Sequence, residues 1–520
     1  MADEKKLNLD IEPARLKTGS SHQLQRDTRF RMIKGLKWVA LAVFVLFILD
    51  SALMRVFMPI HQCPYQNGIQ VMRCVLMDMP KNRKYMEAKQ NVTEEEAREM
   101  LTKGKMRTVI DGHNDLPYMI RQLYGNQIYD KNFDFMHLPY HVDGTRLEKS
   151  NVLGTFWSVF VGCPKSDFDE NGVEFGDAIY ADAVKETFQQ VDLVKRLIEL
   201  NHFMLLKTSS TYDFNSKHEN AVECWFRADA SQNDIDACLF EEIFSLEHNL
   251  YYNEYDGGDW GKVGRRFSFS PHGWLSSMMG AEGLHQIGNS VANLRGLYEL
   301  GVRYMTLTHG CNNRYADSAT ALRGARWGGL SAEGREVVRE MNRMGMLVDL
   351  SHVSADVMRE VLGGVSRAPV MFSHSSVFAL CPHPRNVPDD VLHLVKKNNG
   401  VVMVNFYPLF VSCGPGKIPA NATLEMVVDH IEYIGKLIGW EHVGIGSDFD
   451  GIDSVPAGLE DVSKYPDLTV ELLKRGVKSI DVVKVMGLNI LRVWRAVEIV
   501  SKEMRHNGVL PMEDKFVKNN

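Results

Sequence analysis

Histidine and acidic residues recur in this sequence directly after short apolar segments, at points where buried β-strands would end. Imidazole and carboxylate groups are common ligands of zinc, and manganese and cobalt accept the same mixture. A single histidine of this kind is more often a hydrogen-bonded core residue, but a set at successive strand ends favours a metal site. The residues at these points are His113, Asp115, Glu282, His309, His352, His374, Asn405 and Asp448.

The spacing of these residues predicts a site for two zinc ions. His113 and Asp115 stand two positions apart, so their side chains project in the same direction from one strand end. A carboxylate such as Glu282 can bridge two cations about 3.5–4 Å apart, and His352 and His374 would complete the second ion. Water held between such cations becomes a hydroxide nucleophile near neutral pH. Hydrolysis of a polar carbonyl bond is therefore expected, and no HExxH, GxSxG or P-loop motif indicates another chemistry.

Eight short apolar segments alternate with amphipathic helical stretches such as residues 291–300 and 334–345. This alternation predicts an α/β fold, a closed parallel (β/α)8 barrel of the TIM type, whose strand ends would hold the site. The predicted strands are Thr108–Asp111, Thr155–Phe160, Ser277–Gly280, Arg303–Leu307, Met346–Leu350, Pro369–Phe372, Val401–Asn405 and Val443–Ile445.

Residues 212–270 interrupt this alternation with a polar, aromatic and irregular stretch. We interpret the stretch as a surface insertion of the barrel, held together by its own disulfide between Cys224 and Cys238. The catalytic barrel domain is predicted to span residues 93–505, and residues 506–520 are expected to form a polar C-terminal tail.

The overall composition is that of a globular protein. The chain has 520 residues, of which 45% are hydrophobic, and its 59 Lys+Arg and 66 Asp+Glu leave a net charge of −7. These values exclude a disordered chain, a collagen and a coiled-coil rod. A nucleic-acid partner is not expected, because no basic patch with interleaved aromatic residues is present.

An apolar run at residues 38–49 follows a cluster of basic residues. The run is shorter than the roughly 20 residues of a spanning helix, but residues 51–58 extend it. We expect a transmembrane signal-anchor over residues 36–58, with a cytosolic tail (1–35), a stalk (59–92) and an extracellular or lumenal body. The protein would then be a single-pass type II membrane protein. A cleaved signal peptide is the alternative.

Two further features agree with an exported body. Asn91 and Asn421 begin glycosylation sequons on the predicted outer side. The eight cysteines are even in number and share no CxxC spacing, so disulfides are the expected state in an oxidising compartment.

From about Glu94 to Ile499, apart from the insertion, the sequence resembles the membrane (renal-type) dipeptidases. The resemblance rests on the motifs VIDGHNDLP, FWSV, GVRYMTLTHGCNN, MLVDLSHVS, APVMFSHSS, RNVPDD, VMVNFY, GSDFDG and GLEDVSKYPDL. It implies a (β/α)8 barrel with a two-zinc site that cleaves dipeptides bearing a free carboxyl end. His113 and Asp115 would hold the first zinc, Glu282 would bridge, and His352 and His374 would hold the second.

The resemblance also assigns roles to residues that spacing alone leaves open. His309 would hydrogen-bond the substrate carbonyl as it becomes an oxyanion, and Arg385 would bind the substrate carboxylate. Asp448 would act as the acid/base that moves a proton from water to the leaving amine. On the residues alone, Arg385 could form a loop salt bridge with Asp389, and Asp450 competes with Asp448.

The resemblance further implies disulfides between Cys163 and Cys311 and between Cys381 and Cys413, which leaves Cys63 and Cys74 to pair by elimination. The chain departs from the family in its N-terminal anchor and its insertion. It also lacks a cysteine after Cys413, so any homodimer is expected to be non-covalent. Two other functions remain open: a metal-dependent hydrolase of another small amide or lactam, and a non-catalytic ectodomain that binds a partner through the insertion.

Overall fold

The structure, a computed structural model, describes residues 93–95, 97–98, 109–217, 275–413 and 419–514. Nine parallel strands form one sheet in the order β2-β1-β9-β8-β7-β6-β5-β4-β3, and pairing of β2 with β4 closes eight of them into a barrel. The predicted (β/α)8 barrel is therefore confirmed. The strands are β1 (Val109–Asn114), β2 (Val152–Val159), β3 (Leu205–Lys207), β4 (Leu275–Glu282), β5 (Val302–Thr306), β6 (Leu347–Asp349), β7 (Met371–Phe372), β8 (Val401–Val404) and β9 (Val443–Ile445).

Each of the eight predicted strands overlaps one strand of the closed ring. The ninth strand, β3, was not predicted; it pairs with the first residues of β4, where Leu205 lies opposite Leu275. Its three residues are too few to show a hydrophobic period, and only the first of them is buried.

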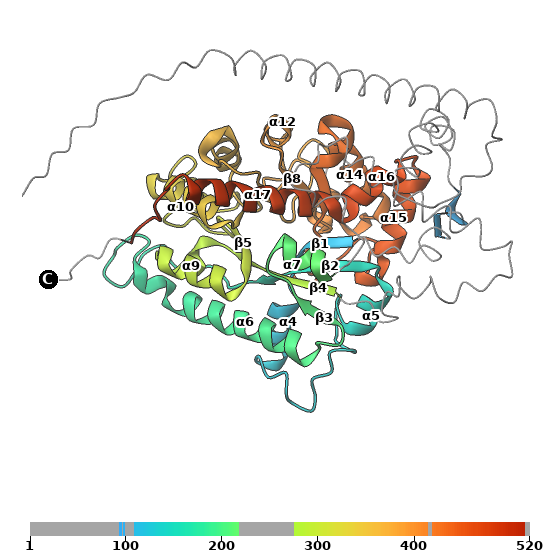
Figure 1. The fold of residues 1–520 in the computed structure, drawn as a ribbon, viewed down its shortest axis with the longest axis horizontal. Helices are drawn as coiled ribbons and strands as arrows, with labels where there is room; N and C mark the ends of the chain where they lie inside the picture. The colour runs from blue at the N-terminus through green and yellow to red at the C-terminus, as the bar shows by residue number, and fades with distance from the viewer. Residues whose placement is uncertain (1–92, 96, 99–108, 218–274, 414–418, 515–520) are drawn as a thin grey trace, which may run out of the picture. The chain divides into compact units, whose positions relative to one another are not determined.

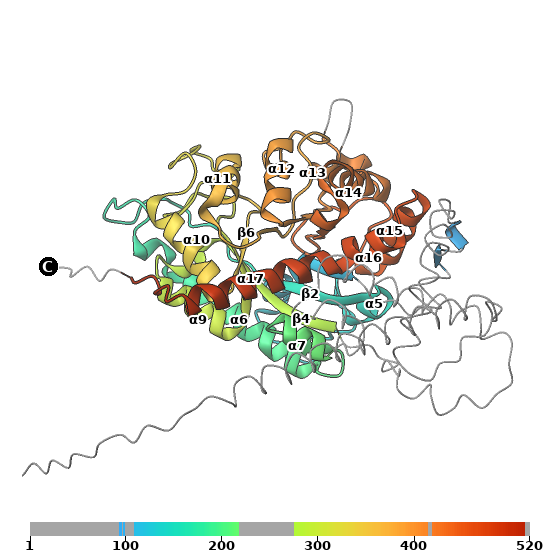
Figure 2. The ribbon, with the colours of Figure 1, turned by 45° about the horizontal axis from the view of Figure 1, so that its top comes forward.

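Helices surround the strands, as Figures 1 and 2 show. The α-helices are α4 (Leu116–Tyr124), α5 (Gly144–Lys149), α6 (Ala181–Leu200), α7 (Thr211–Lys217), α9 (Val291–Leu300), α10 (Ala332–Met344), α11 (Ala355–Glu360), α12 (Asp389–Asn398), α13 (Pro408–Val411), α14 (Leu424–Ile438), α15 (Tyr465–Lys474), α16 (Ser479–Val483) and α17 (Asn489–His506). Short 3-10 helices are η1 (Asp177–Tyr180), η3 (Leu284–Ile287), η5 (Pro419–Asn421), η6 (Trp440–His442) and η7 (Val462–Lys464). Two π-helical turns are η4 (Val361–Val365) and η8 (Lys484–Leu488).

Local sequence explains why these segments adopt their structures. Every residue of β2 and β4 is buried, as expected for parallel strands that helices cover on one face and other strands cover on the other. Helix α10 begins where the Ser331 hydroxyl accepts a hydrogen bond from the Gly334 N–H, and it buries Val337, Val338 and Met341. Such apolar stripes face the barrel and leave the strand ends to polar side chains.

Large side chains fill the barrel interior. Phe156, Met278 and Tyr304 are fully buried and belong to one cluster with Trp494 of α17. The Trp494 and Phe156 rings lie 5.8 Å apart, so α17 packs directly against the interior of the barrel. The barrel is therefore a packed core that holds its strand ends in fixed positions.

Two boundaries differ from the sequence prediction. Residues 212–217 were expected to begin the irregular insertion, but they belong to α7, because Phe214 is buried in the interior cluster and Ser210 caps Asp213 N–H. Residues 506–520 were expected to form a polar tail, but those described up to residue 514 contact the barrel domain. Asp514 accepts a hydrogen bond from the Val291 N–H at the start of α9, and Arg295 donates to the Met512 carbonyl.

Several predictions concern residues outside the described part of the chain. They are the cytosolic tail, the signal-anchor 36–58, the stalk, Asn91, the Cys63–Cys74 pair and the Cys224–Cys238 pair. Within the described residues, no helix combines the length and the apolar character that crossing a bilayer requires. Asn421 lies in η5 and is exposed.

Candidate active site

The structure brings the predicted histidines and acids together at the carboxyl end of the barrel. Glu282 is the last residue of β4, and His113 is the last but one of β1. His352 and His374 follow β6 and β7 in short connections. Because the strands are parallel, these ends meet at one edge of the barrel and the four side chains converge.

Glu282 lies between two groups of ligands, with a different carboxylate oxygen facing each group. Its Oε1 is 2.8 Å from His352 Nε2 and 3.3 Å from His374 Nε2. Its Oε2 is 3.8 Å from Nε2 of His113. This is the arrangement that a bridging carboxylate needs.

His113 and Asp115 form the first group. Nε2 of His113 is 3.1 Å from Oδ2 of Asp115, so the two side chains point the same way, as their spacing predicts. Gly451 closes this side of the site: a Cβ added there would lie 2.2 Å from Oδ2 of Asp115 and 2.7 Å from Oδ1 of Asp448. Only a glycine allows the backbone to approach both carboxylates this closely.

His352 and His374 form the second group, with their Nε2 atoms 2.9 Å apart. Burial lowers the pKa of both imidazoles well below 6.5, and the nearby Arg385 charge lowers both further. Both rings are therefore neutral at physiological pH. A neutral imidazole has a free lone pair, which is the form that binds a metal ion.

The first group has the opposite electrostatics. Burial lowers the pKa of His113, but the negative charges of Asp115 and Glu282 outweigh burial and raise it to about 10. Burial would raise the pKa of Glu282, yet His113 and His352 hold it well below 4.5. At neutral pH a carboxylate faces an imidazolium here, so a cation that binds His113 must displace its proton.

These residues fit a pair of zinc ions. Three imidazoles and two carboxylates converge in a buried space, and zinc prefers this donor set. Oδ1 of Asp115 is buried and has no hydrogen-bond partner among the described residues. A buried carboxylate oxygen without a partner is costly, and a bound cation would remove this cost.

The structure separates Asp448 from Asp450, which the sequence alone did not. Oδ1 of Asp448 is 4.0 Å from His113 Nε2, and its Oδ2 accepts a hydrogen bond from Asn405 Nδ2 at 2.8 Å. Oδ1 of Asp450 instead accepts from the His141 N–H at 2.8 Å. Burial, with nearby acids, raises the pKa of Asp448 to about 7. Asp448, and not Asp450, therefore faces the metal-ligand groups. Asn405, which the sequence analysis identified only as a strand-end residue, orients the Asp448 carboxylate through this hydrogen bond.

Arg385 brings an unpaired positive charge to the same site. Its side chain is 2% exposed, and Nη2 donates to the His374 carbonyl at 3.5 Å. Nε and Nη1 have no hydrogen-bond partner among the described residues. Burial lowers the pKa of Arg385 to about 10, so it remains charged at neutral pH. The alternative partner, Asp389, instead accepts a hydrogen bond from the Tyr433 hydroxyl.

His309 lies against the second group of histidines. Its ring is 4.4 Å from the ring of His352 and 4.7 Å from that of Phe160. Burial lowers the pKa of His309, so its imidazole is neutral and can donate one N–H into the site.

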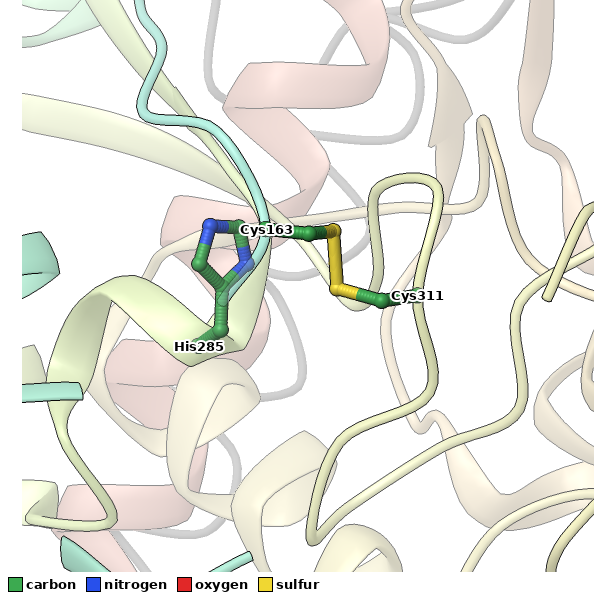
Figure 3. A group of neighbouring side chains, drawn as sticks. All are labelled: Cys163, His285 and Cys311. Carbon is green, nitrogen blue, oxygen red and sulfur yellow. A yellow bond between two sulfur atoms is a disulfide. The ribbon is translucent and has the colours of Figure 1, made fainter. Parts of the chain in front are cut away.

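Both disulfides that the resemblance implied are present in the structure, Cys163–Cys311 and Cys381–Cys413. Cys163, Cys311 and His285 also lie close enough to resemble a metal site (Figure 3). The two sulfur atoms are bonded to each other, however, so neither offers a thiolate. Nε2 of His285 donates to the Val161 carbonyl at 2.8 Å and so fixes the loop that carries Cys163. This group is structural.

Comparison with known proteins agrees with this geometry. Residues 94–228 and 268–508 match the family model of the membrane dipeptidases, peptidase family M19. The dipeptidase aclJ of Aspergillus oryzae is 46% identical over 407 residues, 78% of this chain and 81% of the relative. An uncharacterised dipeptidase of Schizosaccharomyces pombe is 43% identical over 410 residues, 78% of this chain and 85% of the relative.

The same fold occurs in the solved structure of a metallo peptidase from Rhodobacter sphaeroides. That structure is liganded with a phosphinate mimic of the dipeptide L-Ala-D-Ala. The TM-score is 0.56 at 21% identity, covering 75% of this chain and 99% of that chain. Since the family model covers most of the barrel and two relatives exceed 40% identity, the chain belongs to the membrane dipeptidase family, peptidase family M19, and is a metallo-dipeptidase.

Proposed function

We propose that this metallo-dipeptidase holds two zinc ions and hydrolyses dipeptides that have a free C-terminal carboxylate. The observation that carries the proposal is the position of Glu282, whose two oxygens face separate groups of ligands. His113 and Asp115 would hold one ion, and His352 and His374 the other. When bound, the two cations would supply Lewis acidity and lower the pKa of the attacking water.

The remaining site residues would bind the substrate and move its protons. Asp448, with its pKa near 7, would take a proton from the attacking water and pass it to the leaving amine. The neutral His309 would donate its N–H to the substrate carbonyl oxygen as negative charge develops there. The reaction needs a base that can accept a proton and an imidazole that is neutral. Burial keeps His309 neutral, and with a pKa of about 7 Asp448 is partly ionised at neutral pH.

Arg385 would select substrates by their terminal carboxylate. A buried guanidinium with two unpaired donor nitrogens is a site for a planar anion, and a carboxylate matches its geometry. The phosphinate mimic of L-Ala-D-Ala bound by the Rhodobacter sphaeroides peptidase supports a small dipeptide as the substrate class.

The location of the enzyme is also part of this proposal. The apolar run at residues 38–49 supports a type II membrane anchor, with the barrel on the extracellular or lumenal side. Two disulfides in the barrel and the exposed sequon at Asn421 support an oxidising compartment with glycosylation. A non-covalent homodimer stays a prediction.

A hydrolysis assay on the purified full-length protein tests this function. The substrates are a set of dipeptides, the C-terminal amides of the same dipeptides, and a β-lactam, each with and without a zinc chelator. We expect hydrolysis of the free dipeptides, complete loss of activity with chelator, and recovery on addition of zinc. Faster hydrolysis of the amides or the lactam would contradict the substrate class, and activity unaffected by the chelator would contradict the metal site.

A further inference from the structure

Behind the site, the second ring nitrogens of His113 and His374 each meet a buried hydroxyl group, and the hydrogen-bond network behind His374 leads to Asp349. Nδ1 of His374 lies 2.8 Å from the Ser373 hydroxyl. Nδ1 of His113 lies 2.7 Å from the Tyr304 hydroxyl. The Ser373 hydroxyl in turn lies 2.7 Å from Oδ2 of Asp349. All five side chains are buried.

Asp349 fixes the direction of the first hydrogen bond in this network. Oδ1 receives the N–H groups of Ser351 and Ser373 at 3.1 and 2.8 Å, and Oδ2 receives the hydroxyls of Thr306 and Ser373 at 2.5 and 2.7 Å. An ionised carboxylate can only accept, so the four donors satisfy it completely. The single Ser373 proton therefore goes to Asp349, because its other acceptor, the Ser351 hydroxyl, is neutral and 3.4 Å away.

The remaining directions follow from this one. With its proton committed to Asp349, the Ser373 oxygen can only accept, and it has two lone pairs for that purpose. It accepts the proton on Nδ1 of His374. The neutral His374 imidazole therefore carries its hydrogen on Nδ1 and directs the lone pair of Nε2 into the site.

We propose that Asp349, acting through Ser373, sets the tautomer and orientation of His374, so that this ligand presents Nε2 to a metal ion. Asp349 and Ser373 are positioning residues, because neither of them faces the metal or the substrate. The proposal rests on the proposed function, in which His374 is a metal ligand. It adds that a carboxylate at the end of β6 controls this ligand from behind the site.

The chain provides a matched control for the test. Asp111 has the same pattern of four hydrogen bonds: N–H groups from His113 and Ser447 to Oδ1, and hydroxyls from Ser447 and Tyr465 to Oδ2. The Ser447 hydroxyl is 2.7 Å from Asp111, the same distance as in the Ser373–Asp349 pair. The Ser447 hydroxyl, however, makes no hydrogen bond to an imidazole among the described residues.

The test compares zinc affinity in full-length wild type, Ser373→Ala and Ser447→Ala, by competition with a chromogenic chelator. The same proteins loaded with cobalt report ligand geometry through their visible absorption spectra. We expect Ser373→Ala to weaken zinc binding by about 10- to 100-fold and to alter the cobalt spectrum, as loss of such a partner does in other metal sites. Ser447→Ala should retain wild-type affinity and spectrum, even if its metal-free form melts at a similarly lowered temperature.

A second variant keeps the inference testable if Ser373→Ala does not fold. Asp349→Asn keeps the size of the side chain but removes the charged acceptor of the Ser373 hydroxyl, and Asp111→Asn is its control. The expected result is weaker zinc binding in Asp349→Asn than in Asp111→Asn. Equal zinc affinities and cobalt spectra for Ser373→Ala and Ser447→Ala, or for Asp349→Asn and Asp111→Asn, would overturn the inference. A wild-type protein that binds no zinc would instead overturn the proposed function.

Discussion

Replacing Glu282 by glutamine is expected to lower kcat/KM for dipeptides by about 10³-fold or more, since bridging two cations contributes several kcal/mol to the transition state. Glutamine has the same size, but it offers one oxygen and one NH2 group and carries no charge. The oxygens that face His113 on one side and His352 on the other could not both remain ligands. Steady-state kinetics and the zinc content per chain would both report the loss.

Glu340→Gln is the matched control for this variant. Glu340 is also a buried glutamate, 3% exposed, but it lies on α10, where it pairs with Arg343 at 2.7 Å and Arg295 at 3.1 Å. Its loss should destabilise the fold while kcat/KM stays at the wild-type value. Wild-type activity in Glu282→Gln would contradict the bridging role.

Replacing Arg385 by methionine is expected to lower kcat/KM by about 10²- to 10³-fold for dipeptides with a free carboxylate, because a buried, hydrogen-bonded charge pair would be lost. The C-terminal amides of the same dipeptides should be affected far less, since they have no carboxylate for the guanidinium to bind. The preference for the free acid over the amide should therefore nearly disappear. Kinetics on acid and amide pairs would measure this preference directly.

Arg492→Met is the control for the loss of a partly buried arginine. Burial lowers the pKa of Arg492 to about 10, as it does for Arg385, but its nitrogens donate to the carbonyls of Asn399 and Glu441. This variant should lose stability and keep the preference for free acids. If Arg385→Met slowed acids and amides equally, Arg385 would not be the carboxylate-binding residue.

The sequence was sufficient to predict the barrel and the residues that converge on its site. Parallel strands buried on both faces appear as short apolar runs, and a polar residue directly after such a run marks a strand end. This rule located His113, Glu282, His352 and His374 before any contact was known. The same reasoning missed β3, because its three residues are too few to show a hydrophobic pattern. It also missed α7, because Phe214 is a buried apolar residue in a mostly polar segment.

The network behind the metal ligands could not be predicted in the same way. Tyr304 lies inside β5, where a tyrosine is typical of a barrel core, and Asp349 is the last residue of β6. The contacts of Tyr304 with His113 and of Asp349 with Ser373 depend on the register of neighbouring strands. Spacing in the sequence also did not decide between Asp448 and Asp450. Both residues adopt a positive φ in the same turn, and the conformation of this turn determines which of them faces His113.

A crystal structure of the zinc-loaded protein, with anomalous scattering recorded at the zinc edge, tests the dinuclear site most directly. We expect two anomalous peaks, one beside His113 and Asp115 and one beside His352 and His374, with a carboxylate oxygen of Glu282 on each. A single peak, or peaks that Glu282 does not join, would contradict a site for two zinc ions.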